Sequence, residues 1–173
     1  PCSTTDTACS SSLVALHAAR RSLQHHECTM AVIAGVNVLS ASSSMAFAVA
    51  GMTSPDGKCH TFDESANGYC RGEGCAALVV KRLSDAVRDG DNVYAVIRGS
   101  AVMQDGRSAS LTAPNGQAQE MLMRAALADA RLEPSDVTLI EAHGTGTKLG
   151  DPIETGALAN VYGVGRSSDN PLY

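Results

Sequence analysis

The stretch "DTACSSSLVALHAARRS", residues 6–22, places a cysteine directly before a helical pattern. Within residues 10–25 leucines recur at helical spacing, which predicts a helix with one buried side. The near-continuous apolar run at residues 29–39 then predicts a strand that is buried on both faces. A helix that leads directly into such a strand indicates an α/β fold.

The rest of the chain continues this alternation of strands and helices. Apolar runs predict further strands over residues 75–83, 93–103 and 137–147. Helices are predicted over residues 115–132, near 43–51 and, as a short helix or turn, at 84–91. This order of elements favours an α/β fold with mostly buried sheets.

The composition limits the classes of protein that the chain can represent. Its 173 residues are 44% hydrophobic and only 3% aromatic, so a core must be built mainly from aliphatic side chains. The net charge of −5 disfavours binding to nucleic acid or to an anionic membrane. No apolar run approaches the roughly 18 residues of a membrane helix, and we expect no signal peptide before the first motif. We therefore expect a cytoplasmic protein.

Six cysteines are present, and none of them forms a CxxC pair. The spacing of zinc ligands is therefore missing, and we expect no metal site. A chain of this size and apolar content does not need a disulfide framework. We expect a reducing compartment and mostly buried thiols.

Cys9 is the first candidate for chemistry, because it lies where the first helix should begin. There the helix dipole favours a thiolate, and unpaired backbone N–H groups can hold a developing oxyanion. The alternative is a buried structural cysteine, with residues 10–12 capping the helix. The residue pattern by itself leaves both interpretations open.

His143 is the second candidate, because it follows a predicted strand and opens the sequence "HGTGT". The carboxyl ends of strands are where α/β proteins place their sites. Gly144 and Gly146 would let the backbone approach a ligand, and Thr145 and Thr147 offer hydroxyl groups. The alternative is a histidine whose hydrogen bonds are satisfied within a tight turn.

The sequence "GDPIE", residues 150–154, has the pattern of a helix start. Asp151 suits the N-cap, Pro152 the first helical position, and Glu154 the place that a capping box needs. Capping explains the stretch without any function. It also places two carboxylates within one turn, close in sequence to His143.

Two glycine-rich stretches are not interpreted as functional sites by themselves. The sequence "GTGTKLGD" lacks a dinucleotide-binding loop's third glycine, because Leu149 stands in that place. The sequence "FDESANGYCRGEG", residues 62–74, is interpreted as a tight loop that leads into a buried strand.

Taken together, three segments resemble the β-ketoacyl synthases, which are the ketosynthase domains of polyketide and fatty acid synthases. The sequence "DTACSSSLVALH" resembles their active-site signature, and "EAHGTGTKLGDPIE" resembles their second signature. The block "GMTSPDGKCHTFDESANGYCRGEG" between them is similar to ketosynthases of modular, type I polyketide synthases. The resemblance covers essentially the whole chain, with the motifs in the expected order.

The resemblance implies a thiolase-like α/β fold with αβαβα layers, present here in part. Residues 1–173 would form one incomplete ketosynthase domain. Residues 1–90 would be the end of its N-terminal half, and residues 91–173 the start of its C-terminal half.

The resemblance also implies an acyltransferase that joins acyl units. Cys9 matches the nucleophile, which accepts an acyl chain from a phosphopantetheine arm as a thioester. A malonyl-type extender on acyl carrier protein then loses carbon dioxide, and the carbanion attacks this thioester. His143 matches a catalytic histidine whose N–H would stabilise the enolate oxygen.

Four further positions match the second signature. Thr145 and Thr147 match threonines that hydrogen-bond pantetheine, and Asp151 and Glu154 match acidic residues that order the site. Acyl carrier protein is the implied partner, a homodimer is the implied assembly, and no cofactor is bound directly. Alternatives are a fatty acid synthase ketosynthase and a domain that transfers acyl chains without elongating them.

The chain also departs from the family's pattern. Met103 stands where the family usually has Asn, and "SASSSM", residues 40–45, lacks a proline that is often found there. At both places we expect changed substrate contacts or packing and intact chemistry. The family's second histidine and its lysine would come after residue 173. We therefore expect the 173 residues alone to be inactive.

Overall fold

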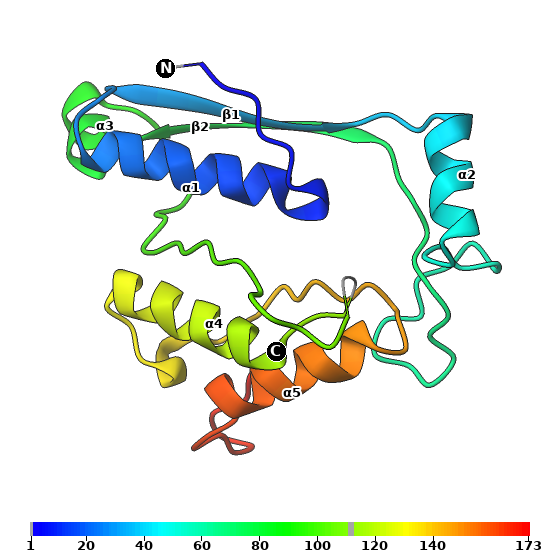
Figure 1. The fold of residues 1–173 in the computed structure, drawn as a ribbon. Helices are drawn as coiled ribbons and strands as arrows, with labels where there is room; N and C mark the ends of the chain where they lie inside the picture. The colour runs from blue at the N-terminus through cyan, green and yellow to red at the C-terminus, as the bar shows by residue number, and fades with distance from the viewer. Residues whose placement is uncertain (1, 111–112) are drawn as a thin grey trace. The chain divides into compact units, whose positions relative to one another are not determined.

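The computed structural model describes residues 2–110 and 113–173 and divides into two compact units (Figure 1). The first unit combines the chain up to Val38 with Gly72–Arg98. The second combines Leu39–Arg71 with Gly99–Tyr173.

The first unit is built on two antiparallel strands, β1 (Met30–Asn37) and β2 (Gly74–Lys81). Their register runs from Met30 opposite Lys81 to Asn37 opposite Gly74. Helix α1 (Ser11–Gln24) lies along one face of this pair of strands (Figure 1). The helix predicted over residues 10–25 and the two strands predicted over 29–39 and 75–83 are thereby confirmed.

The predicted burial of β1 on both faces is wrong for the described structure. Ile33 is buried, whereas its neighbour Val32 is 66% exposed. Alternate side chains of a strand point to opposite faces, and α1 covers only one of them. On the covered face a Cβ atom at Gly35 would lie 3.1 Å from the Cβ atom of Ser12. The absence of a side chain at Gly35 therefore lets helix and strand pack closely.

Arg82, the residue after β2, joins this strand to the end of α1. Its guanidinium donates hydrogen bonds to the carbonyl oxygens of Leu23, at 3.0 Å, and Cys28, at 2.8 Å. It also pairs with Asp85 in the short helix α3 (Leu83–Asp89), at 2.5 Å. Burial opposes ionisation of Asp85, but hydrogen bonds from Arg82 and Arg88 outweigh it and lower the pKa of this carboxyl.

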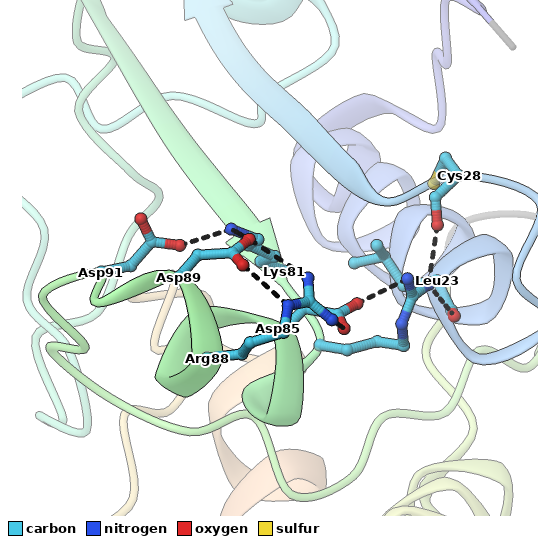
Figure 2. A network of polar contacts seen from close by, with 8 residues as sticks. Leu23, Cys28, Lys81, Asp85, Arg88, Asp89 and Asp91 are labelled. Carbon is cyan, nitrogen blue, oxygen red and sulfur yellow. Dashed lines mark hydrogen bonds and ion pairs between the residues drawn. The ribbon is translucent and has the colours of Figure 1, made fainter.

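A second group of charges closes the turn after α3 (Figure 2). The Lys81 ammonium pairs with Asp89 and Asp91, at 2.5 Å and 2.6 Å. Hydrogen bonds from Arg88 and Lys81 lower the pKa of Asp89 to about 2. The Lys81 ion pairs hold the C-terminal end of α3 against the end of β2.

The second unit has its core between two helices, α4 (Gly116–Ala130) and α5 (Gly150–Tyr162). Leu127 of α4 packs with Val161 and Tyr162 of α5. Partly buried hydrophobic side chains surround these three: Met123, Leu132, Val137, Ile140, Leu158 and Leu172. The 3₁₀ turn η2 (Pro134–Asp136) follows α4. The helix predicted over residues 115–132 is confirmed.

Helix α2 (Ala41–Val49) also belongs to the second unit and confirms the short helix expected in this region. The Arg71 guanidinium lies 4.5 Å from the centre of the Phe47 ring and donates to the Ser43 hydroxyl at 3.1 Å. These contacts attach the end of the loop 50–71 to α2, through a cation–π contact and a hydrogen bond.

Two predicted strands do not form. Residues 93–103 and 137–147 have no regular secondary structure, although both runs are apolar. A strand requires a neighbouring segment that completes its hydrogen-bond ladder. Within the described residues, Thr138 and Ile140 make only two such bonds, both with the backbone of Tyr173. Local sequence cannot supply the partner that a strand needs.

Exposure of the cysteines also differs from the prediction of mostly buried thiols. Five of the six are exposed, Cys28 is half-buried, and no disulfide joins any of them. The reason is that they lie in turns, loops and the uncovered part of the sheet. No helix in the described part of the chain is both long and apolar enough to span a membrane.

Candidate active site

Cys9 lies in a 3₁₀ turn, η1 (Ala8–Ser10), that leads directly into α1. Ala8 has φ = 57°, in the left-handed region that side chains other than glycine seldom adopt. The Ser11 hydroxyl accepts from the Thr7 N–H at 2.9 Å and donates to the Ala8 carbonyl at 2.6 Å. Hydroxyl groups around Cys9 therefore stabilise a strained turn.

The cysteine itself is exposed, which contradicts the alternative of a buried structural thiol. Ser10 stands at the N-cap of α1 but makes no side-chain capping bond, because the hydroxyl network serves the turn before it. Cys9 precedes the first helical residue by two positions. Its thiol is thus accessible beside the end of the helix where backbone N–H groups favour negative charge.

The loop that follows His143 turns sharply, with φ = 54° at Gly144 and φ = 70° at Gly146. The Glu154 carboxylate accepts hydrogen bonds from the His143 N–H at 2.6 Å and the Gly144 N–H at 2.8 Å. Each of its two oxygens takes one bond. Glu154 therefore fixes the two peptide groups that flank the Cα atom of His143.

Asp151 organises the second half of the same loop and is 5% exposed. Its Oδ1 atom accepts from the N–H groups of Gly146, at 3.0 Å, and Thr147, at 3.3 Å. Its Oδ2 atom accepts from the Phe62 N–H at 2.7 Å. A buried carboxylate that accepts three N–H groups is well satisfied, so it can remain buried without a cationic partner.

The expected capping roles of "GDPIE" are wrong. Helix α5 begins at Gly150 with Leu149 at its N-cap, so Asp151 is its second residue and Pro152 its third. The Glu154 carboxylate forms no capping box, because it bonds to the loop before the helix. The loop folds back over the first turn of α5, and its N–H groups donate hydrogen bonds to both carboxylates.

Thr147 caps α5 instead. Its Oγ1 atom accepts from the Gly150 N–H at 3.0 Å and lies 3.3 Å from the Oγ1 atom of Thr145. Both threonines are partly exposed. One of these two hydroxyls donates to the other, which leaves one hydroxyl proton that can be donated to a ligand, while lone pairs on the two oxygens can still accept.

The sequence-based interpretation missed the contribution of the segment 60–68. It was interpreted only as a tight loop that leads into a buried strand; it does lead toward β2, but most residues of that strand are exposed. In addition, the Thr61 hydroxyl donates to the Gly144 carbonyl at 2.6 Å, and the Gly68 N–H donates to the Gly146 carbonyl at 2.9 Å. These contacts span about eighty residues of sequence, so no local pattern could have indicated them.

The structure therefore brings five of the six predicted site residues together in the second unit. These are His143, Thr145, Thr147, Asp151 and Glu154, all on the loop and the first five residues of α5. The sixth, Cys9, lies in the first unit. The chemical role of each residue stays a prediction.

Comparisons with known protein families agree across the chain. Residues 1–86 match the model described as the beta-ketoacyl synthase N-terminal domain, and residues 94–173 match that of the beta-ketoacyl synthase C-terminal domain. These matches identify the same family as the motifs did. The predicted division of the chain at residues 90 and 91 stays a prediction.

The similar curated proteins are large polyketide synthases. One phenolphthiocerol/phthiocerol polyketide synthase protein of Mycobacterium tuberculosis is 56% identical over 96% of this chain. Polyketide synthase GfsA of Streptomyces halstedii is 55% identical over the whole chain. The chain spans only 9% and 2% of their respective lengths.

A solved structure gives the same result for the fold. The ketosynthase from module 6 of the bacillaene synthase of Bacillus subtilis matches with a TM-score of 0.89 and 47% identity. The match covers 92% of this chain and 29% of that one. The predicted thiolase-like α/β fold, present in part, is confirmed. By its two family matches, its relatives and its fold, the chain belongs to the beta-ketoacyl synthase family.

Proposed function

We propose that Cys9 and His143 act in a ketosynthase that elongates polyketide chains. The observation that carries this proposal is the exposed Cys9 thiol on a strained turn at the start of α1. A nucleophile needs access and a nearby source of stabilisation for negative charge, and a helix start offers both. The relatives are polyketide synthases, which favours polyketide over fatty acid synthesis.

In this proposal the reaction has two stages. The Cys9 thiolate attacks the thioester carbonyl of an acyl chain on phosphopantetheine, and the pantetheine sulfur leaves and takes up a proton. A malonyl-type extender then loses carbon dioxide to give an enolate. Its carbon attacks the Cys9 thioester, Cys9 leaves as a thiolate, and the β-ketoacyl product stays on the carrier.

His143 would stabilise the enolate oxygen by donating a hydrogen bond from its imidazole. Its backbone is held by Glu154 at 2.6 Å, which supports a defined position for the side chain. Thr145 and Thr147 would bind the amide or hydroxyl groups of pantetheine. Asp151 and Glu154 would act only by ordering the loop.

The remaining features of the proposal follow from the family. The enzyme class is an acyltransferase of the 3-oxoacyl carrier-protein synthase type. Acyl carrier protein is the proposed partner, with substrates carried on its phosphopantetheine, and the proposed assembly is a homodimer. The 173 residues alone are expected to be inactive, and the cytoplasm stays the predicted location.

Mass spectrometry tests the nucleophile directly in the intact protein, which here means a complete ketosynthase domain that contains these 173 residues. After incubation with an acyl-pantetheine thioester, the unchanged protein should gain one acyl group, and Cys9→Ala should gain none. Cys75→Ala is the matched control, because this thiol is also exposed but lies on β2. Acylation of the Cys9→Ala variant at the normal rate would exclude Cys9 as the nucleophile.

The second stage has its own test. His143→Ala should keep the acylation of Cys9 and lower the decarboxylation of a malonyl thioester by about a hundredfold or more, as expected for loss of a catalytic proton donor. Unchanged decarboxylation would exclude the role of His143.

A further inference from the structure

The peptide groups on both sides of Gly144, the residue after His143, are held by hydrogen bonds. Glu154 accepts the Gly144 N–H at 2.8 Å, and the Thr61 hydroxyl donates to the Gly144 carbonyl at 2.6 Å. Gly144 has φ = 54° and no side chain, so its own conformational preferences fix the backbone poorly. The two hydrogen bonds supply the constraint that the residue itself lacks.

Thr61 also packs directly on this glycine. A Cβ atom built at Gly144 would lie 2.6 Å from the Cγ2 atom of Thr61, so only glycine fits beneath the threonine methyl group. The adjacent residue is anchored as well, since the Phe62 N–H donates to Asp151 at 2.7 Å. Asp151 is the carboxylate that also holds Gly146. Thr61 is therefore fixed to the same framework as the loop that it contacts.

We propose that Thr61 is a positioning residue for His143. Its hydroxyl fixes the Gly144 carbonyl and thereby sets the direction in which the His143 imidazole leaves the backbone. This inference rests on the proposed function of His143. A reaction slows steeply when a catalytic group is displaced by about 1 Å. The hydrogen bond from Thr61 to the residue after His143 can therefore affect the reaction rate although Thr61 does not touch the substrate.

Two variants separate the effect of the Thr61 hydroxyl from the effect of the side-chain volume. Thr61→Val keeps the shape but cannot donate, whereas Thr61→Ser keeps the hydroxyl and loses a methyl group. In the intact protein, Thr61→Val should lower the turnover for malonyl decarboxylation about three- to tenfold, the range for one lost hydrogen bond. Thr61→Ser should stay within about twofold of the unchanged protein, and all variants should acylate Cys9 normally.

A double variant tests whether Thr61 acts through His143. Thr61→Val should have no further effect on decarboxylation when His143→Ala is already present, because the group that it positions is gone. A purely structural role would lower both reactions and would do so in both backgrounds. If Thr61→Val fails to fold, Thr61→Ala, which removes the hydroxyl without adding bulk, takes its place.

Three results would overturn the proposal: unchanged decarboxylation in Thr61→Val, an equal loss of Cys9 acylation, or an undiminished effect beside His143→Ala. Failure of the proposed function has a different signature, namely unchanged decarboxylation in His143→Ala itself. A defective His143→Ala with a normal Thr61→Val would leave the proposed function intact and reject only the positioning role.

Discussion

Replacing Asp151 by Asn tests whether this carboxylate holds the His143 loop and α5 together. The carboxylate accepts three N–H groups from Gly146, Thr147 and Phe62 and is 5% exposed. The asparagine amide has only one acceptor oxygen. Its NH₂ group takes the place of the other oxygen and faces a backbone N–H group, and two donors cannot form a hydrogen bond. At least one bond to a charged acceptor is lost, at about 1.5–3 kcal/mol, and an N–H group is left buried without an acceptor.

We therefore expect Asp151→Asn to lower the free energy of unfolding by about 2–4 kcal/mol, a substantial part of the about 5–15 kcal/mol typical of a folded protein. Urea unfolding of the intact protein, followed by circular dichroism, measures this difference. Asp169→Asn is the matched control, because Asp169 is an exposed aspartate of the same unit. It should change the unfolding free energy by less than about 0.5 kcal/mol.

The outcome that contradicts this reasoning is a pair of variants with equal stability. If Asp151→Asn unfolds at the same urea concentration as Asp169→Asn, the three hydrogen bonds do not hold the loop. Loss of stability without loss of malonyl decarboxylation would instead show that Asp151 supports the fold and does not order the site.

Two further predictions concern the backbone and the charges. Gly146→Ala should destabilise the protein more than Gly57→Ala. Both glycines have positive φ, which costs an alanine about 1–2 kcal/mol. Of the two, only Gly146 has a neighbour that the new Cβ atom would meet, the His60 nitrogen at 3.0 Å. Equal melting temperatures for the two variants would contradict the steric argument. Asp89→Asn should destabilise the protein most above pH 4, and the difference in stability should fade as the pH drops toward 2. The folded state lowers the pKa of Asp89 from 3.8 to about 2. The stability that the ionised carboxylate contributes is therefore lost as this group gains a proton. Melting temperatures between pH 2 and 7 at low salt check this, and a difference that does not vary with pH would contradict it.

Elements with a strong local pattern could be predicted from the sequence. Helices α1 and α4 and strands β1 and β2 form where periodicity or apolar runs placed them. The runs at 93–103 and 137–147 are equally apolar but form no strand. The difference is the partner: β1 and β2 pair with each other in register over eight residues, whereas within the described part of the chain Thr138 and Ile140 make ladder bonds only with the backbone of Tyr173.

The acidic residues show the same limit at the site. From sequence, Asp151 and Glu154 look like ordinary caps of the helix that they begin. In the structure their carboxylates bond to the loop before the helix, and Thr147 caps the helix instead. Which residue caps the helix depends on how the loop folds back over α5. That arrangement is set by contacts in space and cannot be read from the spacing of residues in the sequence.

The amino-acid sequence by itself determined the family, the α/β class and the residues that are candidates for chemistry, because long motifs and local periodicity carry that information. Only the tertiary structure decided which groups hold the His143 loop. Thr61 and Gly68 reach it from more than seventy residues away, and Phe62 shares the Asp151 carboxylate with it. Hydrogen bonds act over about 3 Å in space whatever the separation along the chain, so their partners are fixed only when the chain has folded.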